Sequence, residues 1–101
     1  MPSQCAPHAM GIEATTKRDL LMRLARVRGQ VEGLSRMIEA ERYCPETLQQ
    51  FAAVRASLQA AEKKLFVNHL EGCATQAIAQ GGDAAVTARE ELVDLFYRYM
   101  R

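Results

Sequence analysis

The chain has 101 residues, 49% of them hydrophobic, and 13 Lys and Arg against 12 Asp and Glu give a formal net charge of +1. This length suits one domain with a modest core, and the balanced charge excludes a long basic tail, so any nucleic-acid contact must come from a local patch. No apolar run is long enough to span a membrane. The first dozen residues lack the apolar stretch of a signal peptide, so we expect a cytoplasmic protein. Three cysteines, an odd number, favour reduced thiols over a disulfide framework.

Residues 1–14 contain Pro, Ala and Gly without helical periodicity, and we expect them to form a flexible arm. Residues 15–101 are expected to form a single helical domain. The arm carries Cys5 and His8, three residues apart. These two side chains are either incidental parts of a tail or extra ligands that the arm brings to a metal site.

The first predicted helix has Thr15 or Thr16 as its N-cap and ends near residues 41–42. Its apolar residues recur at three- and four-residue intervals, which is typical of an amphipathic helix: Leu20, Leu24, Val27, Val31, Leu34 and Ile38. Gly29 and Gly33 interrupt this helix at positions where alanine would be more stable by about 1 kcal/mol each. We therefore expect a neighbouring backbone to approach the helix closely there.

A second helix is predicted from Pro45 to about Gln80, where the Gly81-Gly82 pair ends it. The link before it is so short that helices 1 and 2 should form an antiparallel hairpin. Its large apolar residues recur every seven positions, a pattern typical of helix bundles: Phe51, Leu58 and Leu65. A third helix is expected after Asp83, which can act as its cap.

Two thiols and an imidazole stand out in the second helix. His69 and Cys73 are four residues apart and therefore lie on one helical face. Together with Cys44 they form a ligand set that soft transition metals prefer. If the helix is continuous, the rise from Cys44 to His69 is about 37 Å, so one subunit cannot close a site with all three. A shared metal would then lie between antiparallel subunits, bound by Cys44 of one and by His69 and Cys73 of the other.

Burial points to the same antiparallel dimer. Three helices, one of them much longer than the others, cannot enclose a compact core alone. Two hairpins that pair as a four-helix bundle would bury the apolar positions that a single protomer leaves exposed. We therefore expect a homo-oligomer.

Residues 20–73 resemble the CsoR/RcnR family of bacterial metal- and stress-sensing transcriptional repressors. The shared motifs are the R-x-x-R-x-x-GQV-x-G-L-x-RMIE run, the Tyr43-Cys44 pair, the LQQ-x-AAVRA segment and the H-x-x-x-C ending. The resemblance implies an all-α, three-helix protomer that forms an antiparallel four-helix-bundle dimer and then a disc-like tetramer. It also implies a repressor that binds operator DNA and releases it on sensing its effector.

The copper(I)-sensing branch of this family is the most similar, because Cys44, His69 and Cys73 match its ligands. Two thiolates and one imidazole suit Cu(I), whereas zinc prefers a fourth ligand. Nickel- and cobalt-sensing relatives have a histidine where this chain has Ile12, persulfide-sensing relatives lack the histidine, and formaldehyde-sensing relatives generally lack the second cysteine. These effectors, and a metal-storage role, remain the alternatives to a copper(I) sensor.

The resemblance also implies residues that support the metal ligands. Tyr43 and a glutamate of the third helix, Glu91 or Glu90, would hydrogen-bond the free ring nitrogen of His69 and orient the imidazole. The alternatives are hairpin packing for Tyr43 and a solvated helix face for Glu91. An enzyme that uses Cys73 and His69 as nucleophile and base would need an oxyanion hole, and no motif for one is visible. We therefore expect no enzyme.

No helix-turn-helix or zinc finger is visible, so DNA contacts are expected from arginines on the first two helices. The resemblance favours Arg23, Arg26 and Arg55, and Arg18 belongs to the same set. On one subunit these residues resemble an ordinary solvated face, and Arg55 could instead be partly buried against Glu62. Oligomer symmetry would repeat the patch and favour contacts with phosphates and DNA shape.

Overall fold

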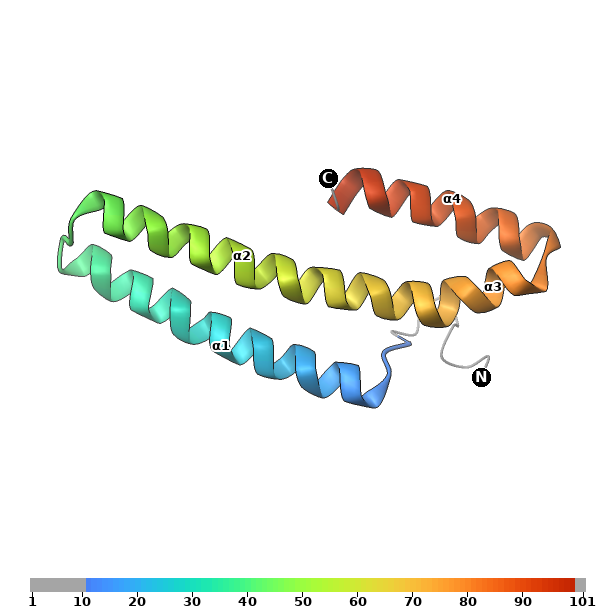
Figure 1. Ribbon diagram of the computed structural model, residues 1–101, viewed down its shortest axis with the longest axis horizontal. Helices are drawn as coiled ribbons and strands as arrows, with labels where there is room; N and C mark the ends of the chain where they lie inside the picture. The colour runs from blue at the N-terminus through green and yellow to red at the C-terminus, as the bar shows by residue number, and fades with distance from the viewer. Residues whose placement is uncertain (1–10, 100–101) are drawn as a thin grey trace. The chain divides into compact units, whose positions relative to one another are not determined.

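The computed structural model describes residues 11–99, and every regular element in that range is helical. The elements are α1 (Ala14–Glu39), α2 (Cys44–His69), the π-helical segment η2 (Leu70–Ala74), α3 (Thr75–Gln80) and α4 (Gly82–Tyr99) (Figure 1). The all-α prediction is confirmed. None of these helices is long and apolar enough to cross a membrane. The chain divides into two compact units: Ala14–Lys64, and residues 65–99 together with residues 11–13.

The Ala14–Lys64 unit is a helical hairpin in which α1 and the first part of α2 run side by side in opposite directions (Figure 1). Its buried side chains recur at seven-residue intervals on both helices: Leu20, Val27 and Leu34 on α1, and Val54 and Ala61 on α2. This is the spacing of a helix seam in a bundle. The predicted antiparallel hairpin is therefore present.

A second apolar stripe on the same hairpin remains exposed. On α1, Leu24, Val31 and Ile38 are 44%, 45% and 56% exposed. On α2, Phe51 and Leu58 are 40% and 45% exposed. One protomer thus buries only one of the two apolar heptad positions on each helix and leaves the other exposed.

The turn between α1 and α2 is closed by backbone hydrogen bonds. The Arg42 N–H donates to the Met37 carbonyl at 3.0 Å, and the Glu41 N–H donates to the Ile38 carbonyl at 3.0 Å. Glu41 adopts a φ of +52°, so this is a Schellman ending with a non-glycine residue in the left-handed position. The helix ends at Glu39 rather than near residues 41–42, because the turn begins there.

Both ends of the hairpin differ slightly from the capping expected from sequence. α1 begins at Ala14, so Thr15 and Thr16 lie inside its first turn and neither is the N-cap. α2 begins at Cys44, one residue before the predicted start. There the Tyr43 carbonyl accepts hydrogen bonds from the Glu46 and Thr47 N–H groups at 3.0 and 3.2 Å, which satisfies two donors of the first turn.

The expectation of a close backbone neighbour at Gly29 and Gly33 is wrong within this protomer. A Cβ at Gly29 would meet nothing within 4 Å among the atoms of the structure, and one at Gly33 would meet only the Arg36 guanidinium, at 3.8 Å. Inside one protomer the two glycines therefore cost helix stability without a steric reason.

The second unit begins with the end of α2 and continues through a π-helical turn. The Thr75 N–H and the Thr75 hydroxyl both donate to the Leu70 carbonyl, five residues earlier, which is the bond pattern of a π-helix. The path from Cys44 to Gln80 is otherwise helical, as predicted. What the sequence pattern did not indicate is the wider turn at Leu70–Ala74.

α4 folds back beside α3 and η2 after a tight turn (Figure 1). Gly81 and Gly82 both have positive φ, +72° and +57°. α4 begins at Gly82, so Asp83 lies in its first turn and is not the cap; its carboxylate there opposes the helix dipole. Only small residues are buried in this unit, and an open apolar groove of about 340 Å³ remains, lined by Phe66, Leu70, Leu92, Val93, Phe96 and Tyr97.

Candidate functional site

The end of α2 meets α4 through an imidazole and a carboxylate. His69 Nε2 lies 3.1 Å from Glu91 Oε1. The His69 side chain is 31% exposed and the Glu91 side chain 56% exposed, so both can be reached from solvent. Of the two glutamates that the sequence left open, Glu91 is the one that the fold brings to His69.

Cys73 lies in η2, four residues after His69, and is half-buried. Its segment is held by the paired Thr75 bonds to the Leu70 carbonyl. Single π-helical turns are rare and concentrate at functional sites. The second thiol of the predicted metal site thus lies on the one irregular stretch of helix in residues 11–99.

The residue before His69 fastens the start of the described chain. The Asn68 side-chain amide donates to the Gly11 carbonyl at 3.1 Å, and its oxygen accepts from the Glu13 N–H at 3.2 Å. The chain that leads into α1 is therefore tied beside His69. The possible extra ligands Cys5 and His8 lie outside the described residues.

Cys44 and Tyr43 lie at the start of α2, and His69 is the last residue of the same helix. Cys44 is an exposed thiol, and Tyr43 is 71% exposed. Over residues 11–99, no group of three or more His, Cys, Asp or Glu side chains is assembled that could hold a metal ion. The helical continuity on which the inter-subunit prediction depends is present as far as His69.

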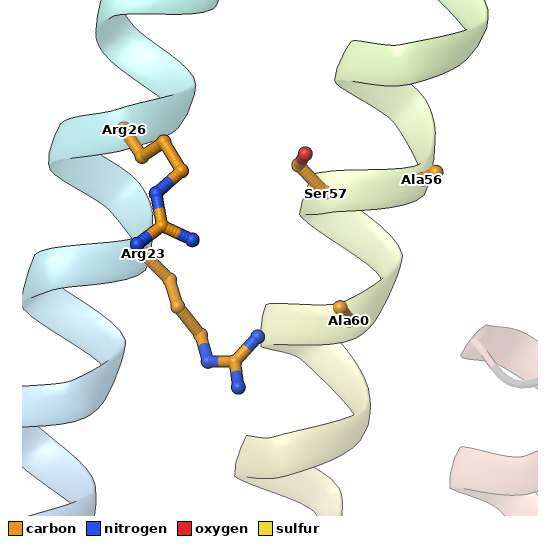
Figure 2. A pocket seen from close by; sticks show the side chains of 5 residues that line it. All are labelled: Arg23, Arg26, Ala56, Ser57 and Ala60. Carbon is orange, nitrogen blue, oxygen red and sulfur yellow. The ribbon is translucent and has the colours of Figure 1, made fainter.

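Two of the predicted DNA-binding arginines line a groove within the hairpin. Arg23 and Arg26 of α1 face Ala56, Ser57 and Ala60 of α2 across an open groove of about 240 Å³ (Figure 2). The two alanines leave the space, because larger side chains there would fill it. Figure 2 shows the Arg23 guanidinium extended toward α2, the Arg26 guanidinium turned along α1 toward Arg23, and the Ser57 side chain on the side of α2 that faces α1.

The other two predicted arginines lie elsewhere. Arg18 and Arg55 are exposed, and neither lines this groove. Arg55 is not partly buried, and no ion pair with Glu62 occurs among residues 11–99. The groove is thus a local feature of Arg23 and Arg26 rather than of the whole arginine set.

Asp19 and Ser57 contact or line this groove region, and neither was predicted from the sequence as a site residue. The Arg23 Nε–H donates to Asp19 Oδ2 at 2.7 Å, and Lys64 Nζ lies 3.5 Å from the same oxygen. Hydrogen bonding by Arg23, together with the two nearby positive charges, lowers the pKa of Asp19 despite its partial desolvation. The i,i+4 spacing of Asp19 and Arg23 was the available signal. For Ser57 no local signal exists, because its place depends on the helix pairing.

Comparison with known proteins identifies the family. Residues 16–98 match the family model described as metal-sensitive transcriptional repressor. The chain is 43% identical over 79 residues to the copper-sensing transcriptional repressor CsoR of Mycobacterium bovis BCG, covering 77% of this chain and 64% of that one. It is 44% identical over 69 residues to the copper-sensing transcriptional repressor RicR of Mycobacterium tuberculosis, covering 68% and 72% of the two chains.

A third relative is more distant but more completely covered. The copper-sensing transcriptional repressor CsoR of Bacillus subtilis is 35% identical over 86 residues, which cover 84% of this chain and 82% of that one. The matched part thus spans somewhat less than two thirds of the M. bovis relative and most of the B. subtilis one. The chain belongs to the metal-sensitive transcriptional repressor family.

Proposed function

We propose that this protein is a copper(I)-responsive transcriptional repressor. On binding Cu(I) between two subunits, at Cys44 of one and His69 and Cys73 of the other, it releases operator DNA. The observation that carries the proposal is the His69–Glu91 contact at 3.1 Å, next to Cys73 on the same helical path. The copper-sensing function named for the relatives of M. bovis and B. subtilis supports the same effector.

The contact with Glu91 prepares His69 to act as a ligand. A neutral imidazole that donates its Nε2 proton to a carboxylate has its lone pair on Nδ1, and metals bind that unprotonated nitrogen. A carboxylate partner of this kind also holds the orientation of the ring. With two thiolates, the donor set is soft and three-coordinate, which suits Cu(I) better than zinc.

The exposed heptad positions support an antiparallel dimer. Leu24, Val31 and Ile38 lie four residues beyond the buried Leu20, Val27 and Leu34, so α1 presents two seams and fills only one. A second hairpin packed on the open seam would complete a four-helix bundle. The same pairing would bring Cys44 of one subunit to His69 and Cys73 of the other, and two such dimers would form the disc-like tetramer.

DNA binding is assigned to the arginines of the hairpin. Arg23 and Arg26 line the groove, and Arg18 and Arg55 are exposed outside it. Repetition of this surface by oligomer symmetry would create a long track for DNA phosphates. Because the sequence shows no helix-turn-helix or zinc finger, readout would depend on backbone contacts and DNA shape.

Regulation requires that the two ligands affect each other. If Cu(I) binding weakens DNA binding by some factor, DNA must weaken Cu(I) binding by the same factor. His69 and Glu91 would transmit the change, because they join the metal-binding end of α2 to α4. We therefore expect the operator complex to bind Cu(I) more weakly than the DNA-free protein.

Mixed subunits test the inter-subunit site. Cys44→Ser alone and the double variant His69→Ala, Cys73→Ser should each fail to bind Cu(I) tightly. A dimer made of one subunit of each kind should recover one of its two sites, because the intact Cys44 of one then faces the intact pair of the other. Tight Cu(I) binding by a strict monomer, or no recovery in the mixed dimer, would overturn the proposed site.

Binding of DNA tests the regulatory function. Fluorescence anisotropy with a duplex from the region upstream of the protein's own gene should show tight binding under reducing conditions and release on adding Cu(I). X-ray absorption of the copper-loaded protein should show two sulfur ligands and one nitrogen ligand, and Cys44→Ala should lose one sulfur. Release by Ni(II), Zn(II), persulfide or formaldehyde but not by Cu(I) would assign the chain to another effector within the family. Copper binding without any DNA binding would favour metal storage.

A further inference from the structure

Asp19 holds Arg23 by one specific nitrogen. The Arg23 Nε–H donates to Asp19 Oδ2 at 2.7 Å, and the two residues are one helical turn apart on α1. Lys64 of α2 approaches the same oxygen at 3.5 Å, so the carboxylate links the two helices of the hairpin. The Asp19 side chain is 39% exposed and the Arg23 side chain 37% exposed. Both are thus packed enough to be oriented and open enough to meet a ligand.

This pairing leaves the outer edge of the Arg23 guanidinium available. A guanidinium has five N–H donors, and Asp19 uses the one on Nε. The terminal nitrogens extend toward Ala60 of α2 (Figure 2), and Arg26 and Ser57 line the same groove. Planar guanidinium donors match phosphate oxygens in geometry, and a serine hydroxyl can add one more donor.

We propose that Asp19 is a positioning residue for DNA binding, which holds Arg23 so that a backbone phosphate of the duplex is bound in the groove by Arg23, Arg26 and Ser57. This inference rests on the proposed DNA-binding function and adds two residues, Asp19 and Ser57, to it. The phosphate of DNA is favoured over a free anion because the groove is open to solvent and would be repeated in each subunit of the proposed oligomer.

A positioning role for Asp19 and simple charge counting predict opposite effects of its removal on DNA affinity. An exposed carboxylate on a DNA-binding face repels phosphates, so removing it should tighten binding if charge alone matters. If Asp19 acts by orienting Arg23, its removal should instead weaken binding, because the free guanidinium must be ordered at the cost of side-chain entropy.

Asp19→Ala in the full chain is the direct test, measured by fluorescence anisotropy on the duplex from upstream of the protein's own gene. We expect binding to weaken by about 3- to 10-fold, since each subunit loses one ordered charge contact. The matched control is Glu32→Ala, which removes an exposed carboxylate from the same helix away from the groove. The control should leave affinity unchanged or raise it slightly.

A double-mutant cycle separates positioning from a structural role. In the Arg23→Ala background, Asp19→Ala should no longer weaken binding, whereas a purely structural defect would weaken it in both backgrounds. The slope of log K against log salt should also become shallower for Asp19→Ala, as fewer phosphates are neutralised. Ser57→Ala should weaken binding by a smaller factor than Arg23→Ala.

The outcomes that overturn the proposal differ from those that overturn the proposed function. If the wild-type protein does not bind the duplex at any salt concentration, the proposed DNA-binding function is wrong. If the wild-type protein binds the duplex and Asp19→Ala binds it as tightly or more tightly, only the positioning role of Asp19 is wrong. If Asp19→Ala is poorly folded, Asp19→Asn is the alternative variant, because it keeps the side-chain shape and one acceptor oxygen. Its affinity for the duplex should lie between those of the wild type and Arg23→Ala.

Discussion

The Ala14–Lys64 hairpin and the unit of residues 65–99 are both helical, but they are built differently. The hairpin consists of regular α-helices with buried residues every seven positions and a turn closed by backbone hydrogen bonds. The other unit contains a π-helical turn and two consecutive glycines with positive φ, and its buried residues are only Ala74 and Ala85. Regular packing thus accompanies the arginine groove, and irregular backbone accompanies His69 and Cys73.

This difference indicates which unit responds more easily to a ligand. Segments that move on ligand binding come from the less stable parts of a fold, with few buried apolar contacts. The π-helical turn has a regular α-helix as its nearest alternative, so a small change at Cys73 can shift the register of the residues after it. We infer that the unit of residues 65–99 is the adaptable one and that the hairpin is the rigid one.

Among the variants that test the difference between the two units, Glu91→Gln should have the largest effect, which is on Cu(I) affinity. The amide keeps a hydrogen-bond acceptor near His69 Nε2 but loses the charge that polarises the ring. Loss of such a supporting carboxylate costs about 10- to 100-fold in metal affinity. Competition with a Cu(I) chelator measures the change, and DNA binding without metal should be unaltered.

Glu90→Gln is the control for that measurement. Glu90 is the neighbouring carboxylate on α4, and His69 is paired with Glu91 rather than with it. Equal losses of copper affinity in both variants would mean that the general negative charge of α4, and not the contact with His69, supports the site.

The next effect concerns the turn before α4. Gly81 has φ +72° and ψ −168°, a region that is open essentially only to glycine. Gly81→Ala should therefore lower the free energy of unfolding by about 1–3 kcal/mol, as measured by urea denaturation. Gly72→Ala is the matched control in the π-helical turn, where an added Cβ meets nothing within 4 Å in the structure. A Gly72→Ala variant that loses as much stability would show that the π-helical turn itself is strained by a side chain.

The residues of the candidate site could be proposed from the sequence because helical spacing is a local property. His69 and Cys73 are four residues apart in the sequence, and Tyr43 and Cys44 follow the short link between helices. The choice between Glu90 and Glu91 could not be made from spacing, because the turn after Gly81 sets the rotation of α4. The structure brings Glu91 to His69.

Other features depend on forces that a sequence pattern does not show. The π-helical turn at Leu70–Ala74 arises when Thr75 directs both its N–H and its hydroxyl to the Leu70 carbonyl, and no composition signal marks it. The expected threonine N-cap of α1 was wrong because the helix already begins at Ala14, before both threonines. The groove requires the pairing of α1 with α2, so Ser57 could not be found from either helix alone.

In the hairpin turn, a substitution by glycine should increase the stability of the protein, by less than Gly81→Ala lowers it. Glu41 occupies the left-handed position of the α1 ending with φ +52°, at a cost of about 1 kcal/mol for a residue with a Cβ. Glu41→Gly should raise the free energy of unfolding by about 0.5–1 kcal/mol. Glu39→Gly, two residues earlier and still in the helix, should lower it by about 1 kcal/mol. If both variants lose stability, the turn is not the site of strain and the hairpin is less regular than its hydrogen bonds indicate.

The smallest expected effect is the pH dependence that the Asp19 carboxyl group gives to the stability of the hairpin. Hydrogen bonding by Arg23 lowers the pKa of Asp19 in the folded chain. A carboxyl group with a lowered folded pKa contributes stability above its unfolded pKa, and that stability is lost as the pH falls through the folded value. In an NMR titration of the carboxyl carbon, Asp19 should therefore titrate below the ordinary aspartate range. In Arg23→Ala the midpoint should move upward toward that range, although Lys64 at 3.5 Å still favours the charged form. A midpoint that stays low in Arg23→Ala would assign the lowering to Lys64 of α2 and would show that the hydrogen bond from Arg23 contributes little to it.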